Sequence, residues 1–153
     1  MEASWMEVVN KDNIDNMETI KVNVEWIEKN FCAALGDNVP GSIVVTARDI
    51  NELKKEISET LRFHVDGMLR DGDSVPKWLI DGDYTFDYNY IDVASLLHAC
   101  EPYATIAALS RVTGINQRLL SHYANGLRNP RPAQRKRIVD GVHEIGRELL
   151  AVS

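Results

Sequence analysis

The first part of the chain contains three short segments that have the pattern of β-strands. Residues 19–25 alternate strictly, so that every second position carries a branched apolar side chain (Ile20, Val22, Val24). A short apolar run covers residues 31–35, and residues 42–46 are rich in β-branched side chains. Three consecutive short strands predict an antiparallel meander.

In residues 49–70 the spacing of apolar residues lengthens from two positions to three or four, which predicts an amphipathic helix. Asp49 is a favourable N-cap, and Glu52 three positions later completes the capping-box pattern. The apolar stripe consists of Ile50, Leu53, Ile57, Leu61, Val65 and Leu69. We expect this stripe to cover the meander and residues 84–88 to form a fourth strand, which gives the order β-β-β-α-β.

The second part carries the pattern of two short helices separated by a tight turn. Such a pair needs a small residue where the helices touch and a glycine with positive φ in the turn, which Ser110 and Gly114 supply. Ile115 and Leu120 are the apolar residues that hold the second helix against the first. The predicted N-caps are Thr105 and Asn116. A polar turn at residues 125–130 precedes a closing helical region at residues 131–150.

Charge divides the 153-residue chain at about the same place as the patterns do. Residues 1–95 carry nine Lys and Arg against nineteen Asp and Glu, a net charge of −10, whereas residues 96–153 carry eight against four, a net charge of +4. A basic region attracts phosphates and an acidic region attracts a cationic partner. Both regions can equally be solvated faces without partners.

The cysteine content and the lack of a long apolar run argue against a disulfide-stabilised exported protein and against a membrane-spanning protein. Cys32 and Cys100 are far apart in a chain without a signal-peptide pattern, so we expect ordinary thiols of a cytoplasmic protein and no disulfide. No run of eighteen apolar residues occurs, and we expect no membrane partner. Three histidines, His64, His98 and His143, have no metal-ligand spacing to one another and are interpreted as ordinary core or surface residues.

Residues 19–88 resemble the N-terminal domain of HicB-type antitoxins. The resemblance rests on the strand exit VEWIEKN, the Pro40-Gly41 turn, the 49–70 helix and the segment GDSVP before the last strand. It implies a partly degraded ribonuclease-H-like domain at 19–89. Ala47-Arg48-Asp49 stands where the family usually has a Gly-Asp-Thr-like turn, so the entry to the helix departs from the family pattern.

Residues 91–150 resemble the Cro/repressor class of helix-turn-helix domains. The resemblance implies an α+β protein whose DNA-binding domain is all-α and spans residues 90–153. Carried over by position, the residues that face bases are Asn116, Gln117, Arg118, Ser121 and His122, and Arg128 contacts a phosphate. Four further basic residues either lie against the sugar-phosphate backbone or only solvate the closing helix: Arg131, Arg135, Lys136 and Arg137. Ser110 replaces the usual Ala; a buried hydroxyl there can bond back to a carbonyl one turn earlier, so we expect little disturbance of the motif.

Together the two resemblances imply an antitoxin that neutralises a HicA-like toxin and represses its own operon. HicA-type toxins are small basic proteins that cleave messenger RNA, and an acidic partner would cover their cationic face. The candidate toxin contacts on the long helix are Glu52, Glu56, Glu59 and Asp66. A single helix-turn-helix reads few base pairs, so we expect a homodimer or a higher oligomer on a palindromic operator.

Two other functions stay open at the sequence level. One is a transcriptional regulator whose N-terminal domain senses a ligand or dimerises without a toxin. The other is a residual metal-dependent nuclease, for which Glu25, Glu28 and Asp49 are the nearest carboxylates. These three lack a recognisable ligand spacing, so we expect no enzyme activity, no metal and no cofactor.

Residues 1–18 fall outside both resemblances. They are an N-terminal extension that forms either a partner-binding helix through Trp5, Met6, Val8 and Val9 or a tail, and Met17 is a second candidate start.

Overall fold

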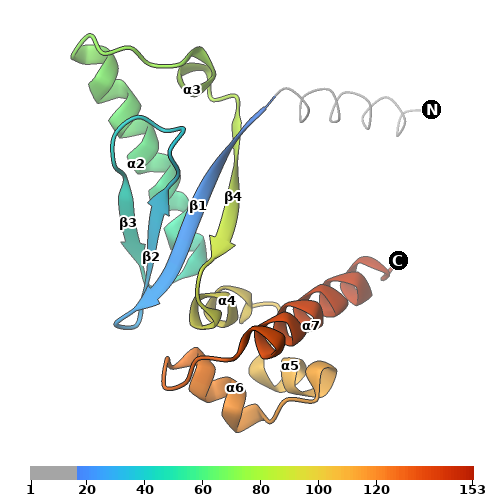
Figure 1. The fold of residues 1–153 in the computed structure, drawn as a ribbon. Helices are drawn as coiled ribbons and strands as arrows, with labels where there is room; N and C mark the ends of the chain where they lie inside the picture. Colours follow the sequence, from blue (N-terminus) through green and yellow to red (C-terminus); the bar gives the residue numbers. More distant parts are fainter. Residues whose placement is uncertain (1–16) are drawn as a thin grey trace.

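A computed structural model describes residues 17–153, which form a mixed α/β structure with a four-stranded sheet and six helices (Figure 1). The strands are β1 (Glu18–Ile27), β2 (Asn30–Leu35), β3 (Val44–Ala47) and β4 (Tyr84–Tyr90). The helices are α2 (Ile50–Arg70), α3 (Lys77–Asp81), α4 (Val93–Cys100), α5 (Ile106–Thr113), α6 (Gln117–Ala124) and α7 (Pro132–Leu150). The expected sheet followed by helices is confirmed, whereas the hypotheses for residues 1–16 lie outside the described range.

The sheet has the strand order β3-β2-β1-β4 (Figure 1). β1 pairs antiparallel with β2, and β2 pairs antiparallel with β3, so the predicted meander is confirmed. β4 lies on the other side of β1 and runs parallel to it. The chain therefore crosses from one edge of the sheet to the other through α2, and β3 and β4 are the two edge strands.

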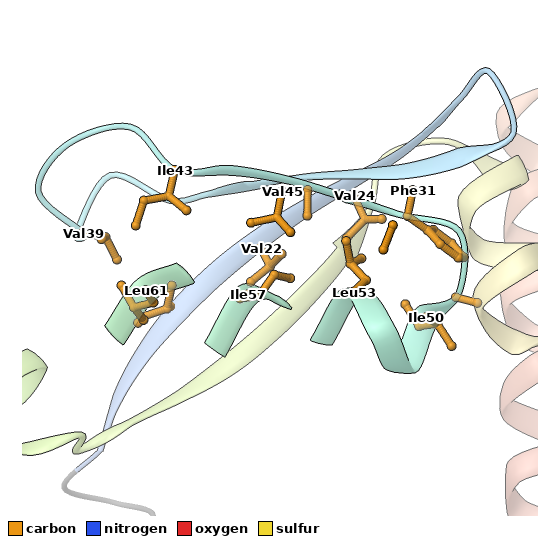
Figure 2. Close-up of a cluster of buried hydrophobic side chains, with 14 of the residues drawn as sticks. Val22, Val24, Phe31, Val39, Ile43, Val45, Ile50, Leu53, Ile57 and Leu61 are labelled. Carbon is orange, nitrogen blue, oxygen red and sulfur yellow. The ribbon is translucent and has the colours of Figure 1, made fainter. Parts of the chain in front are cut away.

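One face of the sheet packs against α2, and this interface is the first hydrophobic core (Figure 2). The alternating residues of β1 (Ile20, Val22, Val24) are completely buried. The predicted stripe of α2 is buried from Ile50 to Val65, but Leu69 is 43% exposed, so its expected burial is wrong. Twenty-one helical residues rise about 30 Å, and the last turn of α2 projects past the sheet in Figure 1.

The start of α2 is determined by its cap. The Asp49 carboxylate accepts hydrogen bonds from the backbone N–H groups of Asn51 and Glu52 at 2.9 and 3.0 Å, so the predicted N-cap is confirmed. The short helix α3 lies between α2 and β4, where the expected order β-β-β-α-β contains no further helix. Five residues are too few to show a helical period, although Leu79 of α3 is buried in the first core.

Helices α4 to α7 enclose a second hydrophobic core. Its buried residues are Val93, Leu96, Leu97, Ala104, Leu109, Ile115, Leu120, Tyr123 and Ile138. Helix α7 crosses α5 closely at Gly141, because a Cβ atom there would come 2.5 Å from Cγ2 of Thr113. Glycine at this position therefore permits the contact between α5 and α7. None of the helices within residues 17–153 has the length and apolar character needed to span a bilayer.

The two cores meet at α4, which is docked onto the sheet by hydrogen bonds. The Asp92 carboxylate accepts from the backbone N–H groups of Trp26 and Ser95 at 3.1 and 2.8 Å. The hydroxyl of the fully buried Ser95 lies 3.2 Å from the carbonyl oxygen of Val24 on β1. Ala99 belongs to the first core although it stands on α4. The helical half is thus held in a defined position on the sheet.

Candidate nucleic-acid interface

Helices α5 and α6 are joined by a three-residue turn whose geometry follows from its sequence. The Thr105 hydroxyl accepts from the N–H of Ala108 at 3.1 Å, and the Asn116 side chain accepts from the N–H of Arg118 at 2.8 Å. Both predicted N-caps are confirmed. Gly114 has a φ of 72°, as predicted, and its N–H donates to the carbonyl of Ser110 at 2.9 Å.

Two hydroxyl groups hold this turn in place. The Ser110 hydroxyl donates forward, to the carbonyl of Ile115 at 2.6 Å, and not to a carbonyl one turn earlier. Ile115 lies in the turn between α5 and α6, so this bond ties the C-terminal end of α5 to the turn. The Thr113 hydroxyl makes the backward bond instead, to the carbonyl of Leu109 at 2.6 Å, and it accepts from the N–H of Ile115 at 3.2 Å.

The polar residues predicted to face bases lie on one side of α6. Leu120 and Tyr123 are buried against the second core. On the opposite side Gln117 and Arg118 are exposed, and Ser121 and His122 are half-buried one turn later. Asn116 is exposed at the start of α6. Its side-chain oxygen Oδ1 accepts the N-cap bond, and its side-chain NH₂ group is left for other contacts.

A cationic pocket lies beside the C-terminal end of α6. It has a volume of about 520 Å³ and is lined by Tyr123, Arg128, Asn129, Arg131, Ala133 and Gln134. We call it the Arg128–Arg131 pocket. Helix α7 begins here with Pro132 at N1, and no side chain of the described residues caps its first turn. The uncapped N–H groups and the two guanidinium groups together favour an anion.

Two other cations of the predicted basic run, Arg135 and Lys136, have intramolecular hydrogen bonds, whereas Arg137 is exposed. Arg135 donates to the carbonyl oxygens of Tyr90 and Ile91, which ties α7 to the end of β4. Lys136 pairs with Asp140 at 2.7 Å, and its hydrogen bond lowers the pKa of the Asp140 carboxyl. Arg128 and Arg131 are therefore the members of the run that line the pocket.

His98 connects α6 with the sheet. Its ring stacks on the indole of Trp26, with centroids 3.7 Å apart and planes 14° apart, and its Nε2 lies 2.8 Å from the carbonyl oxygen of Ala124. A pocket of about 670 Å³ opens at this contact. Its lining consists of Trp26, Glu28, Lys29, His98, Asn125, Gly126 and Leu127, and we call it the junction pocket. The sequence interpretation of His98 as an ordinary residue misses this bridging position.

The acidic candidates of α2 are all exposed, and they lie near an apolar groove. Glu52, Glu56 and Glu59 share the side of α2 that carries Thr60 and Phe63, whereas Lys54 lies on the other side, 5.0 Å from the Tyr88 ring centroid. The groove between α2 and β3 has a volume of about 420 Å³ and includes Phe63, which is 72% exposed. Asp66 lines a different, smaller pocket together with Leu79 of α3 and Tyr84 of β4. Phe63 is absent from the sequence-based candidates.

The three nuclease candidates occupy separate settings. Asp49 caps α2, Glu25 lies half-buried opposite Cys32 on the face of the sheet away from α2, and Glu28 lies in the β1–β2 turn. Within residues 17–153 no group of three His, Cys, Asp or Glu side chains is arranged to hold a metal ion. Cys32 and Cys100 are free thiols, as predicted, and burial raises the pKa of Cys100.

Comparisons with protein-family models, with curated proteins and with solved structures found no match to this chain.

Proposed function

We propose that the protein is a sequence-specific DNA-binding antitoxin, in which α5 and α6 form a helix-turn-helix of the Cro/repressor class. The observation that carries the proposal is the outward polar face of α6 next to the Arg128–Arg131 pocket. An exposed helix with bidentate donors fits a major groove, and a neighbouring anion site fits the backbone that borders the groove.

Base reading is assigned to the first turn and the exposed face of α6. Gln117 can bond an adenine through two hydrogen bonds, and Arg118 can do the same for a guanine. Asn116, Ser121 and His122 supply further donors for bases or phosphates. The side chains at the start of α6 are oriented because the Asn116 cap and the Ser110 and Thr113 hydroxyls hold the turn that precedes them.

Backbone binding is assigned to the Arg128–Arg131 pocket. A phosphate there would meet the guanidinium groups of Arg128 and Arg131 and the N–H groups at the start of α7. Tyr123 is 7% exposed and lines the same pocket, so its hydroxyl is positioned to donate to the phosphate. These contacts position α6 on the duplex without reading its sequence.

We assign the sheet half the role of binding a HicA-like toxin. In this proposal the sheet half is a partly degraded ribonuclease-H-like domain. Two observations support this assignment: a meander followed by a crossover to a strand parallel to β1, and exposed carboxylates on α2 beside the groove that contains Phe63. Carboxylates steer a cationic surface, and an exposed aromatic side chain gives the contact an apolar centre. Neutralisation would be by masking, with no reaction catalysed by the antitoxin.

The junction pocket favours a second candidate function, a regulator that senses a small ligand. A ligand between Trp26 and Leu127 would touch both the β1–β2 turn and the loop after α6. Binding of a ligand there would change the position of α6 relative to the sheet. Isothermal titration calorimetry with candidate metabolites tests for such a ligand. A metabolite that binds the folded protein and also changes its affinity for the operator would favour this function over the antitoxin.

Arg118→Ala tests the DNA half of the proposal. We expect affinity for the duplex upstream of the protein's own coding frame to fall by about 1–3 kcal/mol, and discrimination to relax at one base pair per half-site. Fluorescence anisotropy measures both. Arg62→Ala on α2 removes the same charge from an exposed position of the sheet half and serves as the control. Unchanged affinity in Arg118→Ala would contradict the assignment of α6.

Arg131→Gln tests the phosphate pocket separately from base reading. We expect weaker binding to all duplexes alike, with the slope of log affinity against log salt reduced by about one. Tyr123→Phe should weaken binding while leaving that slope intact, because it removes a neutral donor. A slope that is unchanged in Arg131→Gln would show that this guanidinium lies off the backbone.

Co-expression with the product of an adjacent short reading frame that encodes a basic protein tests the antitoxin half. Growth should be arrested by that product alone and restored by the full chain. Glu56→Lys should weaken the rescue, whereas Glu148→Lys, the same charge change on α7, should leave it intact. A folded chain that leaves such a product fully toxic would refute neutralisation while leaving DNA binding untouched.

A further inference from the structure

We propose that two copies of this chain join through the outer edges of their β4 strands, antiparallel and with Phe86 on the two-fold axis. The inference goes beyond the proposed function and does not depend on it, because it rests on the backbone and side chains of one edge strand. The occupant of the edge is a second copy of the same chain.

The hydrogen bonds at the ends of β4 show which of its backbone groups face outward. The N–H of Glu18 donates to the carbonyl of Asp83 at 3.1 Å, and the N–H of Ile91 donates to the carbonyl of Val24 at 2.9 Å. In a parallel ladder the residues that bond to the neighbour alternate, so Asp83, Ile91 and the odd-numbered residues between them face β1. The N–H and C=O groups of Tyr84, Phe86 and Tyr88 therefore face away from the sheet.

In the part of the chain that the structure describes, this edge has no bulge and no covering strand, and Asp87 is its one charged side chain. β4 has seven residues without Pro or Lys, and its register with β1 runs unbroken from Tyr84 to Tyr90. The opposite edge strand, β3, has only four residues. Arg135 donates to the carbonyl of Tyr90, which closes the outward row at its C-terminal end. Among residues 17–153, no partner is recorded for the outward N–H and C=O groups of Tyr84, Phe86 and Tyr88.

The side chains of the outward residues form an aromatic row that α2 covers incompletely. Ring centroids of Tyr84 and Phe86 are 5.5 Å apart, and those of Phe86 and Tyr88 are 6.2 Å apart. All three side chains are only half-buried. The reason is that α2, although it covers the same face of the sheet, packs mainly on β3 and β2, near the edge opposite β4. A second copy placed edge to edge extends this row and removes more of its apolar surface from water.

The charges of β4 select one register for the pair. With Phe86 on the axis, Tyr84 lies opposite Tyr88 of the partner subunit, and every outward N–H and C=O of the three residues finds a partner. On the opposite face Thr85 lies beside Asp87 of the partner subunit, where a hydroxyl can donate to a carboxylate. An axis through Asp87 would instead oppose two carboxylates. The strand is therefore complementary to itself in the first register.

This pairing produces a continuous eight-stranded sheet with the two helical halves at its opposite ends. The arrangement is isologous, because the same surface is used by both copies, so it closes at two copies and does not form filaments. The two-fold axis runs through the sheet, and helix α6 of each copy is left outside the contact.

Thr85→Asp in the full chain tests the register. It places two pairs of carboxylates across the contact, and we expect the dimer dissociation constant from analytical ultracentrifugation to rise about tenfold. Thr85→Asp combined with Asp87→Thr restores an Asp–Thr pair on each side of the axis and should restore the dimer. Thr46→Asp on β3 adds the same charge to the same face of the sheet at the other edge and should have no effect.

A second measurement covers the case in which Thr85→Asp fails to fold. In the unmodified protein the amide hydrogens of Tyr84, Phe86 and Tyr88 should be protected from exchange at high concentration and released on dilution. A chain that stays monomeric at micromolar concentrations, a Thr46→Asp variant as weak as Thr85→Asp, or a swapped double variant that fails to recover would overturn the proposal. Amides that stay protected in a monomer would also overturn it, since the edge would then be covered by the same chain.

Discussion

Single hydroxyl groups and a single glycine determine how α5, α6 and α7 meet. The Thr113 hydroxyl bonds to the carbonyl of Leu109 and to the N–H of Ile115, so it satisfies both ends of the turn while staying 7% exposed. The methyl group of the same side chain contacts α7 at Gly141. One buried threonine therefore links the geometry of the turn to the packing of the closing helix.

Gly141→Ala and Gly146→Ala should change stability in opposite directions. Alanine at 141 would place its Cβ 2.5 Å from Thr113 Cγ2, and we expect a loss of about 1–3 kcal/mol from overpacking. Gly146 has open space around it in the same helix, so alanine there should add up to about 1 kcal/mol through helix propensity. Urea denaturation measures both, and equal effects would contradict the close crossing of α5 and α7.

Tyr90 should make the fold sensitive to alkaline pH. Burial, followed by the nearby Cys100 and Tyr88, raises the pKa of Tyr90 from 10.0 to about 12. Between these values the unfolded chain loses the phenol proton while the folded chain keeps it, so stability falls as pH rises above about 10. Tyr90→Phe should flatten this decline in melting temperature between pH 9 and 12. Tyr103→Phe, at a 71% exposed site, is the control and should retain the decline.

At the scale of single elements, the caps and the alternating strands were predictable because their signals are local. Asp49, Thr105 and Asn116 are short polar side chains immediately before apolar periods, and all three cap as expected. The position of Phe63 in a groove was not predictable, because the groove is formed by β3 and α2 together. The same holds for Arg135, whose carbonyl partners lie more than forty residues away.

The N-cap of α2 provides a test at this scale. Asp49→Ala removes the acceptor of two backbone hydrogen bonds, and we expect a loss of about 1 kcal/mol in the free energy of unfolding. Asp66→Ala removes the same side chain from an exposed position within α2 and should change stability little. An equal loss in both variants would point to the charge of α2 as the source of the effect.

At the scale of the whole molecule, the boundary between the halves runs through α4. Val93, Leu96 and Leu97 are buried in the second core, whereas Ala99 is buried in the first. His98 of α4 links the sheet to α6, because its ring stacks on Trp26 of β1 and its Nε2 lies 2.8 Å from the carbonyl oxygen of Ala124, the last residue of α6. A change at the β1–β2 turn can therefore reach α6 through two side chains.

Asp92→Ala should uncouple the two halves in unfolding. The carboxylate of Asp92 accepts from the N–H groups of Trp26 on β1 and Ser95 on α4, so its removal leaves two partly buried donors unpaired and costs about 1–3 kcal/mol.

In the unmodified chain, tryptophan fluorescence and far-UV circular dichroism should report one coincident urea transition, since the halves share α4. In Asp92→Ala the transitions should separate, because the bonds from the sheet to the helical half are weakened more than either core. Asp73→Ala, at an exposed loop position, should keep them coincident. Coincident transitions in Asp92→Ala would show that the packing of Ala99 and the Trp26–His98 stack suffice to couple the halves.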